Sequence, residues 1–275
     1  MKMAFATCVQ LGLSCIEEIF RIGGKLDLLI SLKDEKATNK SGRIYLDEIA
    51  NRTDVPLLKI DNINDQEVIS ALHEHQIDWL FIIGWSQIAK KELLNTPTYG
   101  CIGMHPTLLP VGRGRAAIPW AILKGLKETG VTMFKLDEGV DTGPIIGQGV
   151  IPLDSHTTAT ELYKQVNDMH VALISRYWND VANNTIILRA QDETKATEWS
   201  GRKPEDGEIF STMTMDEADT LVRAVTHPYP GAFYRQDSQT IRIWSGLVQR
   251  SFPEEARVVI ALKDGYLIPT DYELE

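Results

Sequence analysis

The first half of the chain alternates short apolar runs with longer amphipathic segments. The apolar runs, which are rich in Ile, Leu, Phe and Val, predict strands at 2–9, 26–32, 56–60, 79–84 and 100–105. The segment 65–76 has helical spacing, since Val68, Ile69 and Leu72 share a face behind Asp65, a candidate N-cap. Continuous apolar strands that alternate with helices predict an α/β fold with a doubly wound, mostly parallel sheet.

Two further strands, predicted at 128–136 and 147–153, flank a loop rich in glycine and aspartate. The segment 160–182 has the length and apolar spacing of a long helix. Sites in parallel sheets lie at the carboxyl ends of strands. This rule points to the loops that follow Val9, Gly84 and His105.

The last third of the chain changes character after a polar stretch at 191–206, which we interpret as a linker. Beyond it, strand-like runs at 233–234, 240–246, 258–262 and 265–269 are separated by turn residues. The predicted organisation is therefore a catalytic domain at 1–190, a linker at 191–206, and a small β-rich domain at 207–275.

Composition narrows the function classes. The 275 residues are 43% hydrophobic and 24% charged, which is typical of a globular protein and excludes a disordered chain. A net charge of −10 argues against a surface that coats nucleic acid. No apolar stretch reaches the roughly 20 residues of a membrane span, so we expect no membrane association.

The cysteines and histidines predict no metal and no disulfide framework. Cys8, Cys15 and Cys101 are an odd number without C-x-x-C spacing, which fits a reducing cytoplasm. The histidines show no spacing typical of metal ligands, so no metal is expected. The first strand is followed by a segment without G-x-G-x-x-G, which removes the main support for a dinucleotide cofactor.

The densest candidate chemistry lies between residues 103 and 148. His105 opens HPTLLP at the end of a predicted strand, and Asp141 lies in VDTGPI after the next one. Histidine exchanges protons near neutral pH, and a neighbouring carboxylate orients the ring and favours its charged form. From placement alone two alternatives stay open: His105 beside Pro106 is structural, and Asp141 stabilises its own turn.

The stretch MHPTLLPVGRGRAAIPWAILKGLKETGVTMFKLDEGVDTGPIIGQ, from Met104 to Gln148, resembles the folate-dependent formyltransferases. That family, which includes methionyl-tRNA formyltransferase, carries Asn-x-His-Pro-Ser-Leu-Leu-Pro, then Arg-Gly, Gly-Val-Thr and Asp-x-Gly in the same order. RAVTHPYPGAF, from Arg223 to Phe233, and the following IRIWSG resemble the family's small C-terminal domain. The resemblance therefore covers most of the chain and implies a Rossmann-like catalytic domain.

The resemblance implies an enzyme that moves a formyl group from 10-formyltetrahydrofolate to a primary amine. His105 would be the general acid and base and would help to stabilise the developing oxyanion, while Asp141 would hold His105. The implied folate contacts come from three stretches and one arginine: Gln87, Ile88, Ala89, Leu108, Leu109, Asp137, Glu138, Gly139, Val140 and Arg115. By placement, we expect the acceptor on an open face near Gln10, Trp85 and Arg113.

One position departs from the family pattern. Gly103 stands where the family has the asparagine that donates to the oxyanion. Loss of one such donor costs about 3–4 kcal/mol in other enzymes. Another donor therefore replaces it, or activity is weak.

The motif details favour a nucleotide-linked amino sugar as acceptor, of the UDP- or dTDP-4-amino-sugar type, on a route to surface glycans. THPYPGAF and the Arg-Gly-Arg that follows LLP are more similar to the amino-sugar domain of the bifunctional polymyxin-resistance enzyme than to the tRNA branch. Initiator tRNA is the alternative acceptor, and the basic segment 33–43 would be its track or else a surface loop. A non-catalytic folate- or nucleotide-binding protein is the other alternative, and the resemblance is compatible with a homodimer.

Overall fold

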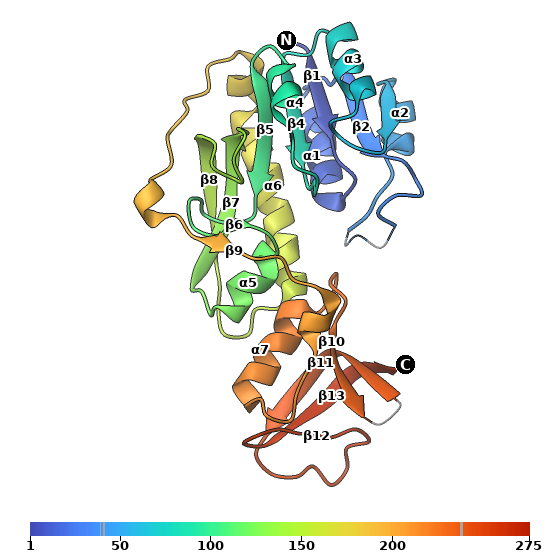
Figure 1. Ribbon diagram of the computed structural model, residues 1–275, viewed down its shortest axis with the longest axis vertical. Coiled ribbons are helices and arrows are strands. Elements are labelled where there is room, and N and C mark those ends of the chain that lie inside the picture. The colour runs from blue at the N-terminus through green and yellow to red at the C-terminus, as the bar shows by residue number, and fades with distance from the viewer. Residues whose placement is uncertain (39, 41, 237–238) are drawn as a thin grey trace. The chain divides into compact units, whose positions relative to one another are not determined.

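The computed structural model describes residues 1–38, 40, 42–236 and 239–275 (Figure 1). The chain forms two compact units, each described here by itself. The first unit comprises Met1–Gly114, Gly130–Ile151 and Val166–Glu198. The second comprises Arg115–Thr129, Pro152–Gln165 and Trp199–Glu275.

A seven-stranded sheet with the order β3-β2-β1-β4-β5-β7-β8 organises the first unit (Figure 1). Its strands pair in parallel from β3 to β5, and β7 runs antiparallel to β5. The prediction of a mostly parallel α/β sheet is therefore confirmed. The strands are β1 (Met3–Ala6), β2 (Leu28–Leu32), β3 (Leu57–Ile60), β4 (Trp79–Ile83), β5 (Gly100–His105), β7 (Glu128–Lys135) and β8 (Ile145–Pro152).

Helices connect these strands, and their apolar faces are buried. In α3 (Gln66–Glu74), Val68, Ile69 and Leu72 are buried, as their spacing predicts. Asp65 is the N-cap residue, but its carboxylate accepts from the Asn62 amide at 2.8 Å and caps no helix amide. The other helices between strands of this sheet include α1 (Gln10–Arg21), α2 (Asp47–Thr53) and α4 (Lys91–Asn95), and the long helix α6 (Ala159–Ala182) follows its last strand, β8.

The centre of the sheet is buried along its whole length, because both faces are covered. Every residue of β1, β2, β4 and β5 is buried. This explains why their sequences are continuous apolar runs without alternation. The predicted strand 100–105 matches β5 residue for residue, and the other strands in this half begin or end slightly inside their predicted ranges.

The second unit contains a four-stranded sheet with the order β10-β11-β13-β12, whose neighbouring strands are antiparallel. The β-rich character predicted for this part of the chain is confirmed. The strands are β10 (Ala232–Gln236), β11 (Gln239–Gln249), β12 (Ile260–Ala261) and β13 (Tyr266–Leu274).

The second unit also holds a helix that the sequence pattern did not predict, α7 (Met215–Val225), which packs against α5 (Ala117–Leu123). Thr214 begins it with a capping box: its hydroxyl accepts from the Glu217 amide, and the Glu217 carboxylate accepts from the Thr214 amide. This reciprocal cap stabilises a helix start that has little apolar periodicity before Leu221.

The stretch predicted as a linker contains short regular elements. These are η1 (Glu193–Lys195), β9 (Glu198–Trp199) and η2 (Pro204–Gly207). A two-stranded sheet joins β9 with β6 (Arg113–Gly114). Over the part of the chain that the structure describes, no helix has the length and apolar content needed to cross a membrane.

Candidate functional site

His105 is the last residue of β5, and its side chain is largely buried. Its Nε2 lies 2.7 Å from the carbonyl oxygen of Gly112. A carbonyl only accepts hydrogen bonds, so Nε2 carries a proton and donates it. The lone pair of the neutral ring is therefore on Nδ1, which is 3.6 Å from Asp141 Oδ2. Nδ1 is thus the ring nitrogen that faces the Asp141 carboxylate.

Asp141 lies in the loop between β7 and β8, with a φ of 54°. Its Oδ2 accepts a hydrogen bond from the Gly114 amide at 2.8 Å. The carboxylate is therefore held from one side by a backbone amide and faces His105 on the other. The structure brings together the two residues that the sequence proposed as an acid–base pair, although they are 36 positions apart in the chain.

Gly103 lies on the same face of β5 as His105, because side chains alternate along a strand. A Cβ atom built on Gly103 would be 2.7 Å from Leu136 Cδ2 and 3.5 Å from Phe134 Cε1. The Leu136 side chain therefore covers the place where the family pattern has asparagine. An apolar side chain donates no hydrogen bond, so this side of the site has lost its amide donor.

The loop after β4 is held by the carboxamide of Gln87. Gln87 Oε1 accepts from the Ile63 amide at 2.8 Å and from Trp85 Nε1 at 3.1 Å, and Nε2 donates to Asp61 O at 3.0 Å. Trp85 and Ala89 pack on the core beneath. Ile88 is 69% exposed, so this loop presents an apolar side chain to solvent.

Leu108 and Leu109 differ from the loop after β4, because their side chains are wholly or partly buried. Leu109 is buried against Phe134 and Ile145, and Leu108 is partly buried. Their contact with folate therefore stays a prediction, and Leu109 has little exposed surface to offer.

The loop after β7 is built around Asp137. Its Oδ1 accepts from the Gly139 amide at 3.1 Å and from Thr142 Oγ1 at 2.7 Å. Glu138 forms an exposed ion pair with Lys91 at 3.0 Å, and Val140 is 43% exposed. The polar members of the loop thus fix its shape, and its tip presents an apolar residue.

The residues expected to meet the acceptor differ in exposure. Gln10 begins α1 and donates from its side chain to Ser14 Oγ at 3.1 Å. Trp85 is partly buried. Arg113 does not lie on an open face, as was expected, because it is only 7% exposed. Its guanidinium donates hydrogen bonds to Gln191 and Glu193. Arg115 belongs to the second unit, and its contact with folate stays a prediction.

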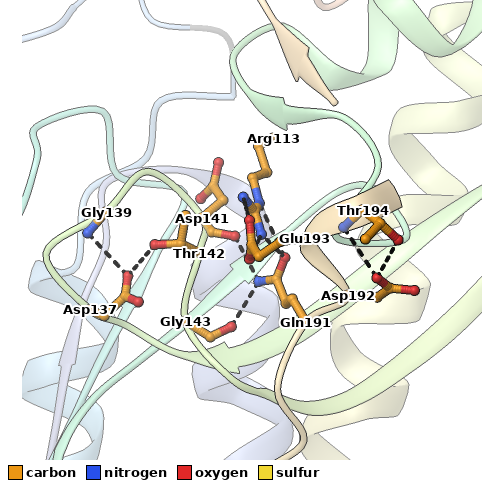
Figure 2. A network of polar contacts seen from close by, with 10 residues as sticks. All are labelled: Arg113, Asp137, Gly139, Asp141, Thr142, Gly143, Gln191, Asp192, Glu193 and Thr194. Atoms are coloured by element: carbon orange, nitrogen blue, oxygen red, sulfur yellow. Dashed lines mark hydrogen bonds and ion pairs between the residues drawn. The ribbon is translucent and has the colours of Figure 1, made fainter. Parts of the chain in front are cut away.

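Figure 2 shows a polar network that the sequence analysis missed. Arg113 Nη2 donates to Gln191 Oε1 at 2.8 Å, and Arg113 Nη1 donates to Glu193 Oε2 at 2.9 Å. Gln191 Nε2 donates to the carbonyl oxygens of Asp141 and Gly143, both at 2.8 Å. The hydrogen bond to Glu193 raises the pKa of Arg113. Both new residues lie in the stretch read as a linker, where polar composition gave no signal of a contact.

A cavity of about 520 Å³ lies beside the loop that follows β7, away from His105. It is lined by Gly100, Tyr99 and Lys91 and by Asp137–Gly139 of the loop. Gly100 is the first residue of β5 and His105 the last, which places them roughly 16 Å apart along an extended strand. Neither His105 nor Asp141 lines this cavity.

His170 is a second buried histidine close enough to His105 to feel its charge. Its Nδ1 lies 2.8 Å from the Val166 carbonyl oxygen. Burial lowers its pKa from 6.5 to about 4, so this ring is neutral at neutral pH. The described residues contain no cluster of three or more side chains suited to holding a metal ion.

Residues 28–177 match the model of the formyl transferase family, and residues 202–273 match the formyl transferase C-terminal domain. The methionyl-tRNA formyltransferase of Desulfotalea psychrophila is 31% identical over 224 residues, which are 81% of this chain and 69% of the relative.

Two solved structures share the fold. The sugar 3N-formyltransferase WlaRD has a TM-score of 0.73 at 20% identity, over 99% of this chain and 97% of the other. The methionyl-tRNA formyltransferase from Clostridium thermocellum has a TM-score of 0.67 at 18% identity, over 100% and 99%. With both domains matched in order, the chain belongs to the formyl transferase family and is a folate-dependent formyltransferase.

Proposed function

We propose that this enzyme transfers the formyl group of 10-formyltetrahydrofolate to the amine of a nucleotide-linked amino sugar, of the UDP- or dTDP-4-amino-sugar type. His105 and Asp141 are the proposed catalytic residues. The folate supplies the formyl carbon and departs through its N10 atom. The attacking amine loses one proton, and His105 Nδ1, which carries the lone pair, takes it up and returns one to the departing nitrogen. Asp141 stabilises the protonated ring between these steps.

Two exposed apolar side chains support a folate site at this edge of the sheet. Ile88 lies in the loop after β4 and is 69% exposed, and Val140 lies in the loop after β7 and is 43% exposed. An aromatic ligand placed between the loops would remove this apolar surface from water. The predicted contacts at Gln87–Ala89 and Asp137–Val140 are thus proposed to act through backbone and apolar surface, since the Gln87 and Asp137 side chains already have partners.

The choice of a small acceptor rests on the contacts that the basic side chains of the segment 33–43 already make within the protein. Lys33 and Lys36 both pair with Asp61, the second at 3.2 Å. Lys40 Nζ donates to the Gly84 carbonyl at 2.9 Å, and the Arg43 guanidinium donates to backbone carbonyls, that of Leu32 among them at 3.2 Å.

Residues 39 and 41 of that segment lie outside the described part of the chain. A tRNA track needs cations that are presented to phosphates. Here each basic side chain named above already contacts a carboxylate or a carbonyl, within a protein of net charge −10. This arrangement supports an acceptor smaller than a nucleic acid.

Methionyl-tRNA is the second candidate acceptor, because the relative from Desulfotalea psychrophila at 31% identity is a methionyl-tRNA formyltransferase. The chain covers 69% of that relative. The two candidates share the donor and the acid–base pair, and they differ in the acceptor alone.

A mass-spectrometric acceptor screen tests the proposal. The panel holds UDP- and dTDP-linked 3-amino and 4-amino sugars and initiator methionyl-tRNA, each with 10-formyltetrahydrofolate. We expect a formylated sugar nucleotide. Formylation of the tRNA alone would move the enzyme to translation initiation, and folate binding without any product would support the non-catalytic alternative.

The same assay tests the catalytic residues. His105→Ala and Asp141→Ala should each lower turnover by at least about 10² while the circular dichroism spectrum stays unchanged. His73→Ala, on the exposed face of α3, is the matched control and should retain turnover. A wild-type rate in either variant would remove the substituted residue from the mechanism.

A further inference from the structure

Gln191 connects the two backbone segments that hold the Asp141 carboxylate. Its Nε2 donates to the carbonyl oxygens of Asp141 and Gly143, and its Oε1 accepts from Arg113 Nη2, all at 2.8 Å (Figure 2). Arg113 is followed by Gly114, whose amide donates to Asp141 Oδ2. One side chain therefore contacts both the loop that carries Asp141 and the strand that binds its carboxylate.

The loop needs such support because Asp141 has a φ of 54°, in the left-handed region. Aspartate adopts this conformation more readily than most residues, yet it still costs free energy relative to the usual regions. The two hydrogen bonds from Gln191 fix the peptide carbonyls on either side of Thr142. A loop fixed at both carbonyls holds the Asp141 side chain in one orientation.

The network is anchored in the interior of the first unit. Arg113 is 7% exposed, and its guanidinium forks onto Gln191 and Glu193. The Arg113 amide also donates to the Thr197 carbonyl at 2.9 Å. Since the guanidinium cannot lose its proton, Arg113 always donates, which fixes Gln191 Oε1 as the acceptor and turns Nε2 towards the loop.

We propose that Gln191, oriented by Arg113, is the positioning residue that sets the Asp141 carboxylate against His105. This inference rests on the proposed function, in which Asp141 stabilises the protonated ring. It also gives the buried Arg113 a role in the site without contact to the acceptor.

The variant Gln191→Glu separates this role from general stability. A carboxylate keeps the acceptor for Arg113, but it has no proton to donate to the carbonyl oxygens of Asp141 and Gly143, and it repels them. We expect an unfolding midpoint close to that of the wild type. We also expect kcat to fall at least tenfold with an unchanged KM for the acceptor.

A double-mutant cycle with Asp141→Asn tests whether Gln191 acts through Asp141. If it does, Gln191→Glu lowers kcat much less in the Asp141→Asn background than in the wild type. The matched control is Ala190→Glu, which adds the same charge at the neighbouring exposed position and should leave kcat near the wild-type value. Equal fold-losses in both backgrounds would overturn the positioning role.

Amide hydrogen exchange tests the loop without any turnover. Gln191→Glu should speed exchange in a peptide covering residues 136–144 and leave β1 and β4 unchanged. Unchanged exchange in that peptide would overturn the inference whatever the activity. Faster exchange together with a fully active Asp141→Asn variant would keep the positioning of the loop and reject the catalytic role of Asp141.

Discussion

Replacing Gly103 with asparagine tests how this site stabilises the oxyanion that develops on the formyl oxygen. The substitution restores the residue of the family pattern, but the Leu136 side chain lies where its Cβ would go. The new Cβ would be 2.7 Å from Leu136 Cδ2 and 3.3 Å from Leu136 Cγ. Since Leu136 is itself packed against Leu109, Phe134 and Ile145, its side chain must shift. Such overpacking costs about 1–3 kcal/mol of unfolding free energy.

The double variant Gly103→Asn/Leu136→Ala removes this conflict. Leu136→Ala deletes Cγ and both methyl groups, and asparagine adds a carboxamide of similar size next to His105. We expect Gly103→Asn alone to lower stability and to give no gain in turnover. The double variant should gain up to about 10²–10³ in turnover, the range lost when one oxyanion donor is removed elsewhere.

The assay is single-turnover formyl transfer with 10-formyltetrahydrofolate and the acceptor identified in the screen, alongside urea denaturation of each variant. Leu136→Ala alone is the control: it should lose about 2 kcal/mol or more of stability without a gain in rate. A rate gain in Gly103→Asn alone, at full stability, would show that Leu136 does not block the position. A folded double variant with unchanged turnover would show that another donor already stabilises the oxyanion.

Two predictions concern stability. The pKa of buried His170 is about 4 against 6.5 unfolded, so the unfolded chain binds the proton first and stability falls as pH drops from about 6.5 towards 4, by up to about 3 kcal/mol. Urea denaturation at both ends of this window should show a flatter slope in His170→Leu than in the wild type, and an equal slope would contradict the assignment. Thr214→Ala removes the cap of α7 and should cost about 1 kcal/mol in thermal or urea unfolding. Thr212→Ala, exposed just before it, is the control and should be neutral.

Local pattern was enough for the central sheet because burial on both faces leaves a continuous apolar run. In β5 that run is bounded by Gly100 and by the His105–Pro106 step, so its limits could be read directly. Helix α7 was missed although Ala218, Leu221, Val222 and Val225 have the i, i+3, i+4, i+7 spacing of a helix face. The spacing Thr214-x-x-Glu217, a capping-box pattern, was a second signal that could have predicted it.

The sequence analysis paired His105 with Asp141 because each follows a predicted strand, and the two do lie 3.6 Å apart. They do not meet as the ends of parallel strands, because β7 runs antiparallel to β5 and its last residue, Lys135, pairs with Ile102. The loop after β7 therefore has to return towards the His105 end of β5 to place Asp141. Gln191 and Leu136 could not be predicted in the same way. The contact from Gln191 to Asp141 spans 50 positions and comes from a polar stretch whose composition is that of any surface segment. Leu136 affects the site because its side chain fills the space next to Gly103. A sequence motif does not show which side chain fills a given space.

In the proposed mechanism, the glycine at position 103 and the polar network around Gln191 both affect His105. In the family pattern, the asparagine two residues before the histidine is an amide donor for the oxyanion. Here Leu136 covers that position, so in the proposed mechanism the oxyanion depends more on His105. His105 Nδ1 lies 3.6 Å from the Asp141 carboxylate, which accepts from the Gly114 amide and belongs to a loop held by Gln191. In the proposed mechanism, the absence of the asparagine therefore makes formyl transfer more dependent on how the network in Figure 2 positions Asp141.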